Sequence, residues 1–246
     1  LLTPRWWNQD SSSVQDAPVV AAEKKVLGYE KPKSVSEQLA RLRELFPNVT
    51  LTHDEYLVEQ PVPLEAEGIF VIPRWEAIAP TYGEAVKIVL DLLKQTRGGK
   101  FNNYCGDKVG PLYLRQHPLT IEMMQQLGEQ QKYFTALVMP GQFGARHKAK
   151  SVRQAEQAYS DIEFGLGAFA VGIMLLTHPE RLGRYGDLWI DCAGDQYASD
   201  AGAQFSGAPI FDFGGGGLGF GSGGVSLVSD GCGSASAFPP QKRLDS

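Results

Sequence analysis

Cys192 and His178 are the residue types from which a thiol-dependent hydrolase could be built. A cysteine becomes a nucleophile when a nearby histidine takes its proton, and an aspartate such as Asp195 would orient that histidine. Structural roles fit the same residues. His178 followed by Pro179 is typical of a helix end, and a cysteine at a strand end is often a small buried hydrophobic residue. A catalytic group of Cys192, His178 and Asp195 is therefore one hypothesis, although no cysteine-hydrolase signature surrounds Cys192.

A second set of candidate residues is basic and lies in one short segment: Arg146, His147, Lys148, Lys150 and Arg153. Such a concentration of cations can attract a phosphate group, a nucleotide or an acidic partner. Ser151 is a predicted helix N-cap, and the amide groups of that helix would add donors for an anion. No aromatic residues alternate with the charges, as they do where single strands of nucleic acid bind. The segment also fits a solvated loop.

Metal-binding patterns are weak. Structural zinc sites usually bring cysteines in pairs two to four residues apart, whereas Cys105, Cys192 and Cys232 are isolated. They could form a site with a histidine only if the fold brought them together. A hard cation could be held by four aspartates, Asp187, Asp191, Asp195 and Asp200. Their spacing does not match the calcium-binding loop of helix–loop–helix proteins. We therefore expect no metal and no cofactor.

The C-terminal segment has the highest glycine density and very little charge. Residues 201–246 contain 12 of the 28 glycines and five charged residues, and residues 214–224 read GGGGLGFGSGG. Glycine at this density disfavours helix and permits positive φ, so we expect short strands and turns with exposed backbone. The pattern G-x-G-x-x-G occurs twice here, but a dinucleotide site needs a helix after it. Residues 225–228 are instead predicted to be a strand, which favours a hairpin turn.

Composition and charge exclude several classes of protein. The net charge is −5, whereas proteins that bind nucleic acid or anionic membranes are normally basic. The longest apolar stretch, residues 164–176, is shorter than the roughly 20 residues of a membrane span. An odd number of cysteines argues against a disulfide framework. We therefore expect a cytoplasmic protein with reduced thiols, without a membrane span and without nucleic acid as partner.

Hydrophobic periodicity predicts an α+β fold. Helices are expected in the N-terminal two thirds, at residues 34–46, 81–98, 120–131, 151–159 and 165–177. Strands are expected at residues 68–73, 134–139, 187–192, 209–213, 218–220 and 225–228, the last three forming an antiparallel, glycine-rich sheet. Because helices and strands alternate up to residue 192, a doubly wound α/β sheet is the alternative. Residues 1–33 are predicted to form an extended arm, whose Trp6 and Trp7 dock on the domain or on a partner, and residues 34–246 a single domain.

Three stretches are similar to a known group of proteins: residues 163–182 (EFGLGAFAVGIMLLTHPERL), 188–195 (LWIDCAGD) and 233–238 (GSASAF). Together they resemble uncharacterised bacterial hypothetical proteins, in particular a domain-of-unknown-function family. That family has a T-x-H-P-E helix end and a closing G-S-A-S turn. The resemblance lies mainly within residues 163–240. It implies a bacterial, cytoplasmic origin, but it assigns no catalytic residue and no substrate.

The leading hypothesis from the sequence is a non-enzymatic binding or accessory protein. Its working surface would be the glycine-rich C-terminal region, joined by Trp6 and Trp7, and its partner another protein or a second copy of the chain. The alternatives are the thiol-dependent hydrolase that uses Cys192 with His178, and phosphate or nucleotide binding through residues 146–153.

Overall fold

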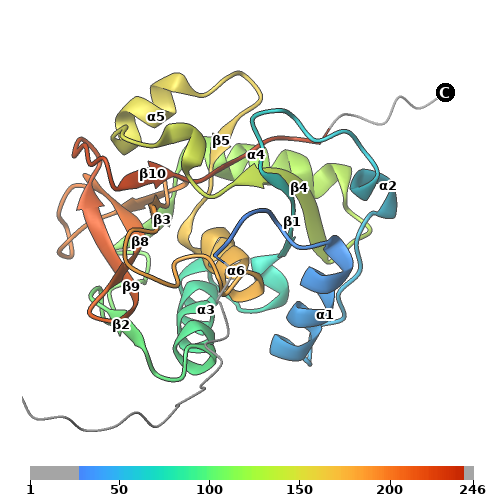
Figure 1. The fold of residues 1–246 in the computed structure, drawn as a ribbon, viewed down its shortest axis with the longest axis horizontal. Coiled ribbons are helices and arrows are strands. Elements are labelled where there is room, and N and C mark those ends of the chain that lie inside the picture. The colour runs from blue at the N-terminus through green and yellow to red at the C-terminus, as the bar shows by residue number, and fades with distance from the viewer. Residues whose placement is uncertain (1–27, 241–246) are drawn as a thin grey trace, which may run out of the picture.

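A wholly buried helix lies between two β-sheets in the structure, a computed structural model that describes residues 28–240 (Figure 1). All ten residues of this helix, α6 (Ala168–Thr177), are buried. A helix that is apolar all round has no face to offer water and is stable only inside a core. Helices α3 (Tyr82–Thr96) and α1 (Val35–Leu45) pack against α6, as does strand β1 (Gly68–Pro73). No helix within residues 28–240 is both long and apolar enough to cross a bilayer.

The remaining helices and strands surround these elements. The other helices are α2 (Glu55–Val58), η1 (Trp75–Ala77), α4 (Pro118–Gln130), η2 (Ala145–His147) and α5 (Val152–Ala158). The other strands are β2 (Phe101–Asn103), β3 (Leu114–Gln116), β4 (Ala136–Gln142), β5 (Phe164–Gly165), β6 (Trp189–Asp191), β7 (Asp195–Tyr197), β8 (Gly207–Gly214), β9 (Gly217–Gly224), β10 (Cys232–Ser234) and β11 (Ser236–Ala237).

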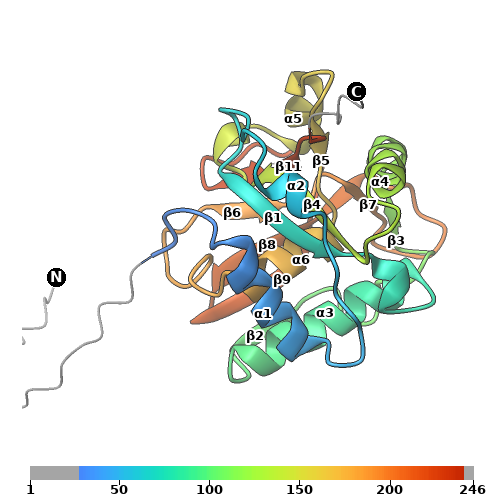
Figure 2. The ribbon, with the colours of Figure 1, turned by 90° about the vertical axis from the view of Figure 1, so that its right-hand side faces the viewer.

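The strands form two sheets (Figure 2). The first is antiparallel, with strand order β1-β4-β11-β5. The second follows the order β10-β6-β8-β7-β3, and β9 pairs with β8 and carries β2 on its other side. The pairs β10–β6 and β2–β9 are parallel. Phe211 of β8 and Phe220 of β9 are fully buried with ring centroids 4.9 Å apart, so the second sheet contributes aromatic side chains to the core.

The predicted α+β class is confirmed, with corrections to its arrangement. Helix α6 lies where a helix was expected, at residues 165–177, but five strands precede it, so helices are not confined to the N-terminus. The glycine-rich strands do form an antiparallel hairpin, but the sheet around them is mixed. Residues 225–228 contain no strand. Strand β9 instead ends at Gly224. The turn between β8 and β9 has two residues, Gly215 and Gly216, whose φ values are 60° and 78°. Two successive positive φ values are what such a hairpin turn requires, and glycine adopts them freely.

Helix starts were predicted well where a side chain closes the first turn. Ser34 and Ser151 form the capping boxes of α1 and α5, and Thr81 caps α3. The predicted start at Thr120 is wrong. Helix α4 begins at Pro118 with His117 as its N-cap, since proline suits the first helical position. The Thr120 hydroxyl instead donates a hydrogen bond to the Gly165 carbonyl.

The last residues of the predicted arm pack on the domain. The Tyr29 hydroxyl donates to a Glu67 carboxylate oxygen at 2.7 Å, and the Lys33 amide donates to Nε2 of His178 at 2.9 Å. Trp6 and Trp7, which were predicted to be binding residues, lie outside the described residues.

Close packing around α6 makes a prediction at Gly172. A Cβ on Gly172 would collide with Cγ1 of the fully buried Val89 and would also contact Phe211. We expect Gly172→Val to lower the free energy of unfolding by about 3 kcal/mol, because overpacking outweighs the few tenths gained in helix propensity. Urea unfolding measures the change. Gly110→Val is the matched control, since a Cβ there has no neighbour within 4 Å. Equal stability of both variants would contradict this account of the core.

Candidate functional site

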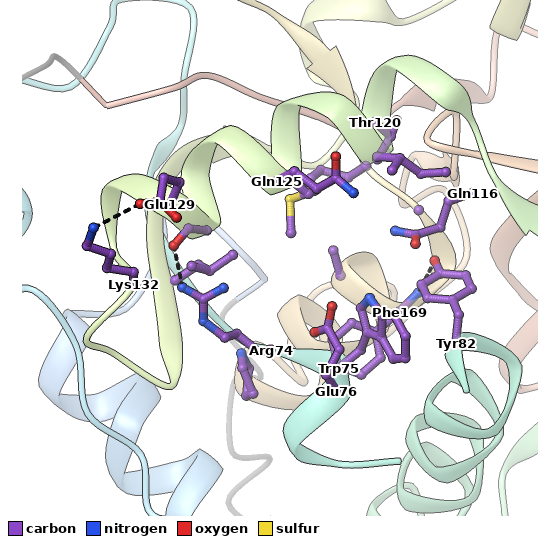
Figure 3. Close-up of a pocket in the computed structure, with 18 residues that line it drawn as sticks. Arg74, Trp75, Glu76, Tyr82, Gln116, Thr120, Gln125, Glu129, Lys132 and Phe169 are labelled. Atoms are coloured by element: carbon purple, nitrogen blue, oxygen red, sulfur yellow. Dashed lines mark hydrogen bonds and ion pairs between the residues drawn. The ribbon is translucent and has the colours of Figure 1, made fainter. Parts of the chain in front are cut away.

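A pocket of about 680 Å³ opens between α4 and the N-terminal end of α6 (Figure 3). One face of α4 forms a wall, with side chains at the spacing of successive helical turns: Thr120, Ile121, Met124, Gln125 and Glu129. Trp75 and Glu76 of η1 form the opposite wall. Phe169 and Leu137 contribute apolar surface. Concave, mostly apolar sites with a few polar groups are the usual form of small-molecule sites.

The two ends of the pocket differ in chemistry. Gln116 and Tyr82 lie at one end, whereas Arg74, Glu129 and Lys132 lie at the other (Figure 3). Glu129 and Lys132 form an ion pair at 2.9 Å. Arg74 donates hydrogen bonds to the carbonyls of Gly128, Gln131 and Phe134. It thereby closes the C-terminal end of α4, where a cation is favoured by the helix dipole. The Tyr82–Gln116 end therefore offers uncharged hydrogen-bonding groups, and the other end offers charges that are already paired.

Tyr82 is fixed by a buried carboxylate behind it. Its hydroxyl donates to both oxygens of Asp195, at 2.8 and 2.9 Å. The Ala168 amide donates to Asp195 Oδ2 at 2.7 Å. Ala168 is the first residue of α6, and the N-cap Gly167 has no side chain to satisfy the first amides. Asp195 thus caps α6 from another part of the chain, and a negative charge is favoured at a helix N-terminus.

Burial changes the proton affinity of this pair. Burial raises the pKa of Asp195 to about 7, even though the hydrogen bonds from Ala168 and Tyr82 act in the opposite direction. Burial and the neighbouring Asp195 charge raise the pKa of Tyr82 well above its ordinary value. Carboxyl groups with a pKa near neutrality are found more often at functional sites than elsewhere in proteins.

Asp195 and His178 do not belong to one catalytic group, which corrects the thiol-hydrolase prediction. Asp195 bonds the first residue of α6, and His178 is the C-cap at the far end of the same helix. Ten residues at 1.5 Å per residue put about 15 Å between the two ends. No hydrogen bond within residues 28–240 joins the Cys192 thiol to His178.

The surroundings of Cys192 and His178 also oppose catalysis. Cys192 is fully buried, and burial followed by the charges of Asp195 and Asp191 raises the pKa of its thiol well above the ordinary value. A reactive cysteine needs the opposite shift. His178 is fully buried as well. Nε2 accepts from the Lys33 amide, and Nδ1 lies 2.9 Å from the Met174 carbonyl. Burial lowers the pKa of His178 to about 4, so this residue is a neutral helix cap.

Part of the predicted phosphate site is engaged within the fold. His147 and Arg146 are bound to Glu163, whose oxygens lie 2.7 Å from His147 Nε2 and 3.1 Å from Arg146 Nε. The first amides of α5 are occupied by Ser151 Oγ and by the Val225 carbonyl. Lys148, Lys150 and Arg153 have no ion pair among the described residues, so phosphate binding through these three residues stays a prediction.

Glu163 is a structural anchor that sequence reasoning missed. Its side chain is fully buried and it accepts hydrogen bonds from His147, Arg146 and the Ser236 hydroxyl, the last at 2.6 Å. Burial by itself would raise the pKa of Glu163, but the hydrogen bonds from His147 and Ser236 outweigh it and hold that pKa below its ordinary value. The carboxylate therefore joins η2, β5 and β11. A lone glutamate just before an apolar stretch was the only sequence signal.

The sequence analysis also did not identify the residues that line the pocket. Trp75, Tyr82 and Gln116 come from η1, the start of α3 and the end of β3, and no short motif joins them. Of the predicted catalytic residues only Asp195 lies beside the pocket, where it supports Tyr82. No group of three or more metal-ligating side chains is found among the described residues.

The titration of Asp195 makes a prediction about stability. Because its folded-state pKa of about 7 exceeds its ordinary value of 3.8, the folded state holds the proton more tightly than the unfolded state. Stability should therefore fall as pH rises from about 4 to about 7. Between about pH 5 and about pH 8, the free energy of unfolding of the wild type should fall by roughly 2–3 kcal/mol more than that of Asp195→Asn. Urea unfolding at both pH values measures this. Asp107→Asn should keep the wild-type slope, and identical slopes for Asp195→Asn and wild type would contradict the assignment.

Removal of the Glu163 anchor should destabilise the fold. Glu163→Ala leaves buried His147 and Ser236 without their acceptor, and we expect a loss of about 3 kcal/mol near neutral pH. Because the pKa of Glu163 is lowered, its contribution should disappear as pH falls through that depressed value. Thermal unfolding across this acidic range checks both points. Glu65→Ala removes an exposed carboxylate and should change little; an equally small effect of Glu163→Ala would refute the anchor role.

Comparison with known proteins does not indicate a function for this pocket. No protein-family model, no curated protein and no solved structure matches the chain. The bacterial family resemblance over residues 163–240 therefore stays a prediction.

Proposed function

We propose that this chain is a binding protein whose pocket between α4 and α6 holds a small, uncharged molecule with a ring and a hydrogen-bonding group. The observation that carries the proposal is the Tyr82 hydroxyl, held by buried Asp195 at one end of an aromatic-lined pocket of about 680 Å³. A side chain held from behind costs little further ordering when a ligand binds.

The lining defines the ligand class. Trp75 and Tyr82 meet edge to face at 6.0 Å, and Tyr82 and Phe169 lie 6.4 Å apart, so one side of the pocket is aromatic. Met124 faces this side from α4 and can adapt its flexible side chain to a ring. The Gln116 amide beside Tyr82 supports recognition of an amide-like group. A carboxylate is disfavoured because the nearby Asp195 carries negative charge above its pKa of about 7.

An acid–base enzyme is the second candidate. The observation that favours it is the pKa of Asp195, because a general base is most effective when its pKa lies near the working pH. Tyr82 stands between Asp195 and the pocket, so proton transfer would pass through the phenol hydroxyl. In that case Tyr82→Phe would abolish turnover and leave the ring-binding part of the pocket intact.

We also propose a cellular location and a source for the protein. The three cysteines are free thiols, which supports a reducing compartment such as the cytoplasm. The resemblance over residues 163–240 supports a bacterial source. A protein partner or a second copy of the chain remains a proposal as well.

Ligand binding can be tested with three molecules that share one ring: benzamide, benzoate and toluene. We expect benzamide to bind most tightly, by about fivefold or more, because a site that hydrogen-bonds a polar group discriminates against ligands without it. Saturation-transfer NMR measures the order. Met124→Trp should fill the pocket and remove binding, whereas Leu64→Trp places the same ring on the exposed surface and should not. Tyr82→Phe should reduce the preference for the amide. Unchanged benzamide binding by Met124→Trp would overturn the proposal.

A further inference from the structure

One face of the β8–β9 hairpin has side chains on β8 but only glycines on β9. Residues opposite each other in an antiparallel pair share a face. Phe211 pairs with Phe220 and Phe213 with Leu218, so these residues form the core face. On the other face, Ala208, Ile210 and Asp212 stand opposite Gly223, Gly221 and Gly219. The alternation of glycine with Leu218 and Phe220 therefore has the period of a strand. The Asp212 carboxylate lies over Gly219, whereas no side chain lies as close over Gly221 and Gly223.

This face is the floor of a second cavity, of about 390 Å³, which we call the glycine groove. Its floor is Gly221 and Gly223, and its walls include Ile210, Trp189 and Leu227. Trp189 and Leu227 are 39% and 71% exposed, so they give the groove apolar surface that a ligand can cover. The groove shares no lining residue with the pocket between α4 and α6.

Two carboxylates line the glycine groove. Asp191 pairs in register with Ile210, and Asp212 follows Ile210 by two residues on the same strand, so both side chains project from the groove face. Neither carboxylate forms an ion pair or a side-chain hydrogen bond within residues 28–240. Burial raises the pKa of Asp191 to about 6 and also raises that of Asp212. An unpaired, partly buried carboxylate is costly to the fold, and a bound cation would offset that cost.

We propose that the glycine groove binds a small organic cation, an ammonium or guanidinium group on a short apolar body. The charged group lies between Asp191 and Asp212, and the apolar body lies over Gly221 against Ile210 and Leu227. Trp189 and Tyr104 add aromatic surface beside the cation, which attracts positive charge through the ring faces. Anions and purely apolar molecules leave the two carboxylates unpaired and are rejected.

The glycine floor is essential to this inference. A Cβ on Gly221 would meet Tyr104 and Ile210 at 3.7 and 3.9 Å, which is ordinary van der Waals contact. A side chain is therefore tolerated at this position, and valine favours strands. Gly221→Val thus fills the groove without disturbing the hairpin, and it separates loss of binding from loss of folding.

Three molecules with the same phenylethyl body test the charge requirement: phenethylamine, 2-phenylethanol and 3-phenylpropionate. Isothermal titration calorimetry on the full chain should give binding of the amine that is about tenfold or more tighter than that of the alcohol, and no binding of the acid. Amide shifts of Gly219, Gly221 and Gly223 in NMR spectra should report the amine, whereas the Trp75 indole signal should not move.

Variants assign the binding to the groove. Asp191→Asn and Gly221→Val should each weaken amine binding by about tenfold or more, while Asp107→Asn and Gly110→Val should leave it unchanged. Circular dichroism confirms that each variant folds, and Gly221→Val decides the question if Asp191→Asn does not. Equal affinity for amine and alcohol, absence of amine binding, or amine binding that Gly221→Val does not weaken would each overturn the proposal.

Discussion

The complete burial of α6 is the constraint on which the rest of the structure depends. A helix leaves its first amides and last carbonyls without partners, and inside a core no water is available to satisfy them. Asp195 accepts from the Ala168 amide at one end, and His178 with Lys33 closes the other. Both groups are therefore needed where they are, and their polar atoms are used for capping. This explains why Asp195 and His178 lie at opposite ends of α6 and not in one catalytic group with Cys192.

The same capping bond connects the core with the pocket. Asp195 accepts from Tyr82 as well as from α6, so the position of the Tyr82 hydroxyl is tied to the N-terminus of the central helix. Arg74 plays a comparable part on the other side, because it closes the C-terminal end of α4 and lines the pocket at that end. The pocket is thus built from groups that the fold already requires, and its polar end is rigid without dedicated support.

Glycine serves two opposite purposes in this chain. Gly172 in α6 lets the helix approach Val89 and Phe211 closely, where any side chain would collide. Gly221 and Gly223 in β9 instead leave space that no other side chain fills. The first use creates packing and the second prevents it. High glycine content by itself does not distinguish the two, because the difference lies in what stands opposite each residue.

Local signals in the sequence determined the helices capped by Ser34, Thr81 and Ser151, the strand at residues 68–73 and the glycine turn of the hairpin. Caps and turns depend on residues only a few positions apart. The tertiary structure alone decided the sites. Tyr82 meets Asp195 across 113 residues, and Glu163 meets Ser236 across 73. Such contacts form because buried polar groups must find partners wherever the packed elements bring them. Local patterns carry no record of that pairing, so Cys192 and His178 indicated chemistry that their burial does not support, whereas Tyr82 was not identified as a functional residue.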